Sequence, residues 1–263
     1  MTADADLFDP RTVLARPDLA ELALEGLVRA DAYAATEVMH GLSPVADIFD
    51  GPDGGSNRID QLLHGEIFDV LDTHGAYVWG RARRDGVVGW MAAEGLAPGA
   101  PDVDRRVIST SGEWPLNALV AADESVAAET VPVGDFETDP AAVAERLLGT
   151  PHALGARSSV STDCAGLVQQ ALYACGRAGP RYADQQAALG RGVSRDEAAR
   201  GDLVVWLHGT GGAGWTGHSG FMLEGGRVIH ASGERGGVVI ESFADADARY
   251  RADGFDAPVF RRL

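Results

Sequence analysis

The carboxyl-terminal half of this chain places helical patterns before strand patterns, and this order limits the folds that it can adopt. A helix is predicted at 140–148 before Gly149, a second begins at Cys164, and a third covers 184–189. Apolar strand patterns bounded by turn residues follow at 203–207, 218–223, 227–231, 238–241 and 257–261. We therefore expect an α+β domain, residues 139–263, with helices on one side of an antiparallel sheet.

The preceding part of the chain has a different pattern. Short strand patterns separated by turn residues occupy 45–49, 66–71, 77–82 and 87–91. Strands at this spacing predict a small β-barrel over residues 35–97. We interpret residues 1–34 as an N-terminal leader with a short helical turn at best. Residues 98–138, with Pro, Gly, Asp and Ser and weaker strand patterns, are interpreted as a linker or a reduced further module.

Composition excludes several classes of protein. Hydrophobic residues make up 45% and charged residues 23%, as in ordinary soluble proteins, and the net charge of −17 argues against binding nucleic acid or an anionic membrane. The chain begins without the pattern of a signal peptide and contains no apolar run long enough to span a bilayer, so we expect a cytoplasmic protein. Histidines and cysteines lack metal-binding spacings, and we expect neither a metal nor a cofactor.

Cys164 opens the second predicted helix. Small and apolar residues recur after it at three- and four-residue steps, while Thr162 and Asp163 are suitable N-caps. A thiol at the positive end of a helix dipole tends to have a lowered pKa and to be a nucleophile. The alternative is a small buried cysteine that begins a helix. Cys175 is eleven residues further on, about 16 Å along a helix, so the two cannot form a disulfide.

Two histidines follow on neighbouring predicted strands. His218 and His230 flank a hairpin whose turn is Glu224-Gly225-Gly226. With a three-residue loop the histidines share one face, directly opposite or one diagonal step apart, whereas a two-residue loop would separate them. Together with Cys164 they suggest a nucleophile, a base and a residue that orients the base. Each histidine alone is more simply explained as a hydrogen-bonded core residue.

These residues resemble the NlpC-type cell-wall cysteine peptidases, papain-like enzymes with a compact α+β catalytic domain. The resemblance extends over 139–263 and depends on four motifs. They are Asp163-Cys164-Ala165-Gly166-Leu167-Val168, Gly201-Asp202-Leu203-Val204-Val205-Trp206, Gly217-His218-Ser219-Gly220 and Ile229-His230-Ala231, with Leu148-Gly149-Thr150-Pro151 upstream. The resemblance implies that Cys164, His218 and His230 are catalytic and that Asp163 contacts the free amine of the substrate.

The 35–97 segment resembles the bacterial SH3-like domain fused to family members that cleave γ-D-glutamyl bonds in murein peptides. In those enzymes this domain restricts the site to peptides with a free N-terminal L-Ala. The segment containing Glu66 resembles the acidic contact of that domain, which makes Glu66 a candidate substrate-binding residue. A solvated glutamate at a strand end is an equally simple interpretation. Trp90 and Val87 stand where such domains often have tyrosines, and the resemblance makes Trp90 a further candidate substrate-binding residue.

The chain also departs from the family pattern around the nucleophile. His152 and Leu154 replace a tyrosine and a tryptophan, Ala165 replaces the usual serine after the cysteine, and Ala183 stands where a hydroxyl residue is common. His152 keeps a possible hydrogen-bond donor for an oxyanion. The changes spare Cys164 and the histidines but alter positions that would hold a murein peptide, so the natural substrate is left open.

A glycine-rich stretch at 209–214 fits the dinucleotide-binding pattern G-x-G-x-x-G, but a strand and not a helix is predicted after it. We interpret 209–217 as a loop beside the catalytic hairpin. The resulting hypothesis is a cysteine endopeptidase acting on a small murein peptide through an acyl-enzyme at Cys164. Two alternatives are a non-catalytic peptide-binding protein that keeps the three residues as a relic, and a transferase that uses the same thiol for acyl or amide transfer.

Overall fold

A computed structural model describes residues 8–53, 55–124, 126–212 and 215–263. The chain divides into two compact units. The first is Met1–Arg105 with Ala118–Val126, and the second is Arg106–Asn117 with Ala127–Leu263. Among the described residues, no helix is long and apolar enough to cross a membrane.

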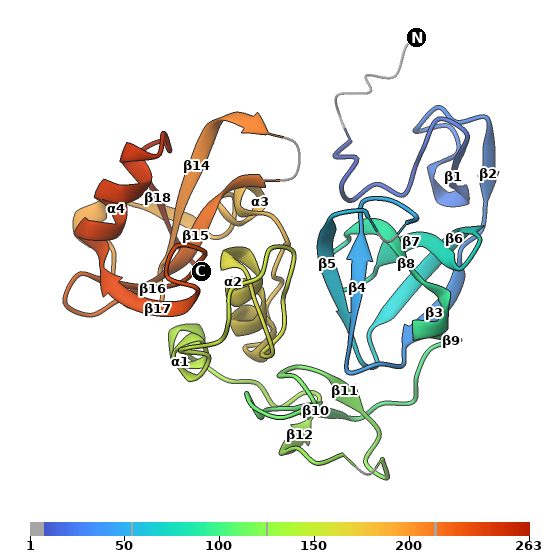
Figure 1. Cartoon of the computed structure of the whole chain (residues 1–263), viewed down its shortest axis with the longest axis horizontal. Coiled ribbons are helices and arrows are strands. Elements are labelled where there is room, and N and C mark those ends of the chain that lie inside the picture. Colours follow the sequence, from blue (N-terminus) through green and yellow to red (C-terminus); the bar gives the residue numbers. More distant parts are fainter. Residues whose placement is uncertain (1–7, 54, 125, 213–214) are drawn as a thin grey trace. The chain divides into compact units, whose positions relative to one another are not determined.

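The first unit is built around a seven-stranded sheet in the order β5-β4-β8-β7-β6-β3-β9 (Figure 1). Its strands are β3 (Glu37–Gly41), β4 (Val45–Phe49), β5 (Arg58–Leu63), β6 (Ile67–His74), β7 (Tyr77–Ala82), β8 (Val88–Ala92) and β9 (Leu96–Pro98). All four predicted strands are present. The prediction missed β3, β5 and β9. Ile48, Leu62, Phe68 and Met91 belong to the apolar core of this unit.

The segment before β3, interpreted from the sequence as a leader with a short helical turn at best, contains two short strands. It forms the short parallel strands β1 (Leu19–Glu21) and β2 (Ala32–Ala34), joined through a 3-10 turn at Leu22–Leu24. The Arg16 guanidinium lies 4.2 Å from the ring centroid of Trp79 and 5.5 Å from that of Trp90. This segment therefore packs against aromatic residues of β7 and β8. Short strands β10 (Arg105–Val107), β11 (Leu119–Val120) and β12 (Thr130–Pro132) follow β9.

The second unit contains a six-stranded sheet in the order β13-β18-β14-β15-β16-β17, with antiparallel neighbours throughout. Its strands are β13 (Arg191–Val193), β14 (Leu203–Gly212), β15 (Trp215–Leu223), β16 (Arg227–Ser232), β17 (Gly237–Ser242) and β18 (Val259–Arg262). Its helices are α1 (Pro140–Arg146), α2 (Cys164–Ala174), α3 (Ala183–Gln186) and α4 (Phe243–Ala252). The α+β architecture predicted from the sequence is confirmed.

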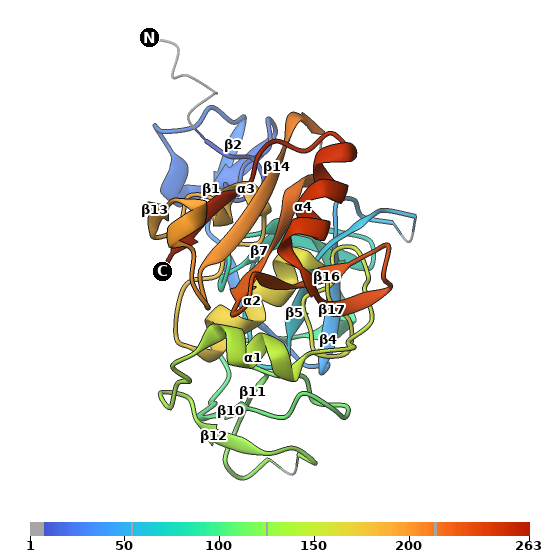
Figure 2. The ribbon, with the colours of Figure 1, turned by 90° about the vertical axis from the view of Figure 1, so that its left-hand side faces the viewer.

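Helices cover both faces of this sheet, and the prediction of helices on one side was wrong. α1 and α2 pack against apolar side chains that include Phe221 and Ile229. On the other face, Phe243 and Tyr250 of α4 pack against Trp206. In both views α2 and α4 lie on opposite sides of the strands (Figure 1 and Figure 2). The prediction omitted α4 because its surface is rich in charged residues and its apolar side is narrow.

Two helices are shorter than predicted, and the first has a clear terminating signal. Asp139 caps α1 by accepting hydrogen bonds from the N–H groups of Ala141 and Ala142, at 2.9 and 3.2 Å. The chain leaves α1 after Arg146, and Gly149 has a φ of +85°, a left-handed conformation that favours glycine. Helix α3 ends at Gln186 because the chain then turns toward β13.

Candidate active site

Cys164 is the first residue of α2 and is buried, as the helical pattern predicted. The Asp163 side chain caps this helix by accepting a hydrogen bond from the Gly166 N–H at 2.8 Å. The preceding loop packs so closely that a Cβ on Gly166 would lie 2.3 Å from the Ala156 carbonyl oxygen and 2.8 Å from the Arg157 Cα. Glycine at this position therefore allows the loop to fix the start of the helix.

The two histidines are adjacent in space. The pairs Phe221↔Ile229 and Leu223↔Arg227 leave a three-residue loop between β15 and β16, so the register follows the prediction. His218 Nε2 lies 2.6 Å from His230 Nδ1, and their rings are perpendicular. Gly220 of β15 lies beside His230 of the paired strand: a Cβ there would be 2.9 Å from that of His230 and 2.5 Å from the Ile229 carbonyl oxygen. Its missing side chain gives the second imidazole its space.

The start of α2 is tied to the strand that carries the first histidine. The Ser219 N–H donates a hydrogen bond to the Cys164 sulfur. Gln186 of α3 adds a second connection, because its amide donates to the Ala165 carbonyl at 3.0 Å and accepts from the Ser219 hydroxyl at 2.8 Å. The thiol is thus held beside the residue that follows His218.

Three further residues extend the histidine pair, and the sequence interpretation missed all of them. Glu241 Oε1 on β17 lies 2.7 Å from His230 Nε2. Arg249 donates to both oxygens of the same carboxylate, at 3.0 and 2.5 Å. The Tyr250 ring stacks on His218 with centroids 4.3 Å apart, and its hydroxyl is 2.9 Å from His218 Nε2. The apolar spacing of Phe243, Ala246 and Tyr250 is the sequence signal that would have revealed α4.

The electrostatics of the thiol differ from the expectation. Burial, together with the neighbouring Asp163 carboxylate, raises the pKa of Cys164 to about 12, against smaller opposing contributions from Ser219 and Arg181. The prediction of a lowered thiol pKa was therefore wrong. A helix dipole contributes about 0.3–1 kcal/mol at an exposed site, and desolvation of a fully buried thiolate outweighs it.

The histidines are shifted toward their neutral forms. Burial lowers the pKa of His218 well below its ordinary value, and the neighbouring His230, His152 and Arg249 lower it further. Burial also lowers the pKa of His230, against the opposing effect of Glu241. These shifts favour a neutral thiol and neutral imidazoles, which suits transfer of the thiol proton during attack.

Asp163 is saturated with donors. The Gly166 N–H and Arg181 Nη1 contact its Oδ1 at 2.8 and 2.9 Å. The Gly155 N–H and Arg181 Nη2 contact its Oδ2 at 2.9 and 2.5 Å. For Asp163 to contact a substrate amine as predicted, one of these hydrogen-bond donors must move away from the carboxylate.

The other predicted contacts near the nucleophile lie around this carboxylate. The His152 ring is half-buried against Gly233, with burial lowering its pKa and Asp163 opposing that shift. Ala165 is buried in the first turn of α2. At the positions of the altered family pattern, Leu154 is exposed and Ala183 is buried. Asp163 thus affects the pKa of His152, and His152 in turn affects the pKa of His218.

Glu66 and Trp90 belong to the first unit. The Glu66 side chain is only 1% exposed and binds Arg84 at 3.2 Å and the Leu63 N–H at 3.0 Å. It is therefore not the solvated strand-end glutamate that the sequence allowed. The Trp90 ring contacts Arg16 and the edge of His74. Their proposed contact with a substrate stays a prediction.

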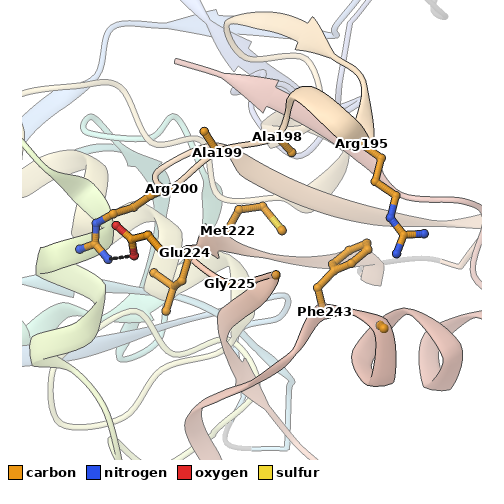
Figure 3. A pocket seen from close by; sticks show the side chains of 11 residues that line it. Arg195, Ala198, Ala199, Arg200, Met222, Glu224, Gly225 and Phe243 are labelled. Atoms are coloured by element: carbon orange, nitrogen blue, oxygen red, sulfur yellow. Dashed lines mark hydrogen bonds and ion pairs between the residues drawn. The ribbon is translucent and has the colours of Figure 1, made fainter.

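The described residues contain no cluster of histidine, cysteine or acidic side chains that could hold a metal ion. The prediction of a loop over 209–217 was wrong, because β14 extends to Gly212 and β15 begins at Trp215; residues 213–214 lie outside the described residues. A strand and not a helix follows the glycine-rich segment, which excludes a dinucleotide-binding turn. A cavity of about 520 Å³ lies elsewhere, between the β15–β16 turn and α4, where Arg195 packs over Phe243 (Figure 3). None of the predicted site residues lines it.

Both units match known domains. Residues 149–254 match the NlpC/P60 family, and residues 48–96 match the bacterial dipeptidyl-peptidase SH3 domain. A crystal structure of an NlpC/P60 family protein from Bacillus cereus has a TM-score of 0.72 and 15% identity, covering 86% of this chain and 99% of that one. The chain therefore contains an NlpC/P60 domain and a bacterial dipeptidyl-peptidase SH3 domain, as the resemblance predicted.

Curated relatives match a shorter part of the chain. A probable endopeptidase of Haemophilus influenzae is 36% identical over 95 residues, which are 36% of this chain and 57% of that protein. The γ-D-glutamyl-L-lysine dipeptidyl-peptidase of Bacillus subtilis is 34% identical over 84 residues, 32% of this chain and 28% of that protein. The peptidoglycan endopeptidase RipB of Mycobacterium tuberculosis is 37% identical over 83 residues, 32% of each. The matches thus span about half or less of these relatives.

Proposed function

We propose that this chain is a cysteine peptidase that hydrolyses γ-D-glutamyl–diamino acid bonds in small peptides derived from peptidoglycan. The observation that carries the proposal is the arrangement of Cys164, His218 and His230 within the NlpC/P60 match. The peptidoglycan hydrolases among the relatives support the substrate class. The SH3 match and the similarity to a γ-D-glutamyl-L-lysine dipeptidyl-peptidase support the bond.

The reaction would proceed in two halves. The Cys164 proton passes to His218 while the sulfur attacks the γ-carbonyl carbon. The C–N bond then breaks, and the leaving amine takes the proton from His218, which leaves a thioester. Water next attacks the thioester and gives a proton to His218. As the acid leaves, the cysteine sulfur recovers that proton. His230 keeps the ring of His218 oriented throughout.

One observation favours a second candidate. The Cys164 thiol is buried and has a raised pKa, as in a structural cysteine, so a binding protein without catalysis is the main competitor. The hydrogen-bonded histidine pair beside the thiol favours the enzyme, since a binding protein has no use for an oriented base.

The deciding experiment is incubation of the protein with L-Ala-γ-D-Glu-diamino acid tripeptides, with the products identified by mass spectrometry. The proposal predicts release of the diamino acid by the wild type and none by Cys164→Ala. An acceptor amine added to the assay separates hydrolysis from transfer, because a transferase would give the amide. Parallel N-acetylated tripeptides test the expected requirement for a free L-Ala amine. Binding of the tripeptide without cleavage would establish the competing function.

A further inference from the structure

The chain of hydrogen bonds at the site does not stop at the second histidine. His230 Nδ1 faces His218, and its other ring nitrogen faces Glu241 Oε1 at 2.7 Å. His218 and His230 are buried, and the Glu241 side chain is only 15% exposed. An ionised carboxylate has only acceptor atoms. The nitrogen that faces it must therefore carry a proton.

This requirement determines the proton positions on both rings. With the proton on Nε2, neutral His230 presents a lone pair at Nδ1 and so accepts from Nε2–H of His218. His218 then keeps a lone pair on its Nδ1, the nitrogen that is free to act as a base. The opposite tautomer of His230 would place a ring lone pair against the carboxylate. The Tyr250 hydroxyl, 2.9 Å from His218 Nε2 and 3.3 Å from His230 Nδ1, is compatible with this assignment, because it can accept from the first nitrogen or donate to the second.

Two arginines, one from α4 and one from the turn between β16 and β17, keep Glu241 ionised and in place. Arg249 binds both carboxylate oxygens and holds the Glu241 pKa below its ordinary value. Arg235 lies 3.7 Å from Oε2. Glu234 also pairs with Arg249, at 2.9 Å, but its side chain is 58% exposed. Glu234 therefore offers a matched control on the same arginine.

We propose that Glu241 is a positioning residue for catalysis, which fixes through His230 the tautomer in which His218 presents Nδ1 as the base for Cys164. The inference rests on the proposed function for its catalytic consequence. It assigns a fourth member to the Cys–His–His arrangement, supplied by β17, and explains why an arginine is held beside the site. The Arg249 side chain secures the carboxylate through both of its oxygens.

The test compares Glu241→Ala, Glu241→Gln and the control Glu234→Gln in the full chain. We expect Glu241→Ala to lower kcat/KM by about 10- to 100-fold, the range for loss of an outer hydrogen-bond partner, mainly through kcat. Glu241→Gln keeps an acceptor oxygen, so its loss should be smaller. Glu234→Gln should match the wild type. Equal activity of Glu241→Ala and the wild type, or an equal loss in the Glu234→Gln control, would overturn the proposal.

A second measurement reads the histidines directly. Nitrogen-15 NMR of the histidine rings should show Nε2-protonated His218 and His230 in the wild type, and a mixture of tautomers in Glu241→Ala. Unchanged ring-nitrogen shifts in that variant would refute the positioning role. The spectra need no turnover, so an inactive wild type would count against the proposed function while this result still decides the role of Glu241. If Glu241→Ala fails to fold, the ring spectra of Glu241→Gln decide it.

Discussion

Gly166→Ala provides a demanding test of how the fold positions the nucleophile. In a helix, alanine is more favourable than glycine by about 1 kcal/mol, so without a steric obstacle this substitution would stabilise the protein. Here the new Cβ would lie 2.3 Å from the Ala156 carbonyl oxygen, and both the Arg157 Cα and Thr162 Oγ1 would be 2.8 Å away. Ordinary contact begins at 3.4 Å, so backbone atoms must move by about 1 Å.

Such overpacking costs about 1–3 kcal/mol, of which the gain in helix propensity offsets about 1 kcal/mol. We expect Gly166→Ala to lower the free energy of unfolding by up to about 2 kcal/mol, measured by urea denaturation. A displacement of about 1 Å at a reacting group can reduce the rate by about 100-fold, so hydrolysis should fall more than stability. The control is Gly134→Ala, where the added Cβ meets nothing within 4 Å. A Gly166→Ala protein more stable than the wild type would refute the reasoning.

Three other predictions follow from the same structure. Gly220→Ala places a Cβ 2.5 Å from a carbonyl oxygen of the facing strand and should lower the free energy of unfolding, measured in urea, by about 1–3 kcal/mol. The control Gly134→Ala should change that free energy by less than about 0.5 kcal/mol. Equal urea midpoints for the two variants would contradict this prediction. Burial lowers the pKa of His218 in the folded state, so below the unfolded pKa of about 6.5 the unfolded chain binds more protons and stability falls as the pH drops. The melting temperature should therefore decline from pH 7.5 to 5.5, and less steeply in His218→Gln. An identical decline in the two proteins would contradict the assignment. In a Cys175→Ala background, iodoacetamide should alkylate Cys164 slowly near neutral pH and faster as the pH rises, since its pKa is raised to about 12; rapid alkylation at pH 6 would show a thiolate instead.

The sequence was most informative where local patterns determine local structure. The position of Cys164 at a helix start follows from its N-cap and its apolar spacing, and the facing histidines follow from a three-residue loop between alternating strands. These are short-range effects. The α+β order also follows, because helices and strands have different periods.

The remaining features depend on contacts between distant segments. The pKa of Cys164 is dominated by burial, which the sequence around it does not reveal. Glu241 reaches His230 across neighbouring strands, and Tyr250 reaches His218 from α4, a helix that follows it by about thirty residues. The charged pattern of α4 concealed both its helical character and its role. Packing of Arg181 onto Asp163, eighteen residues earlier, was hidden for the same reason.

The central claim is that Cys164 attacks the γ-carbonyl and carries the acyl group. The most direct measurement is acid quenching of a reaction with an L-Ala-γ-D-Glu-diamino acid peptide, followed by mass spectrometry of the digested protein. We predict a transient L-Ala-γ-D-Glu acyl adduct on the fragment that contains Cys164, and no adduct or turnover in Cys164→Ala. Continued hydrolysis by Cys164→Ala would contradict the account.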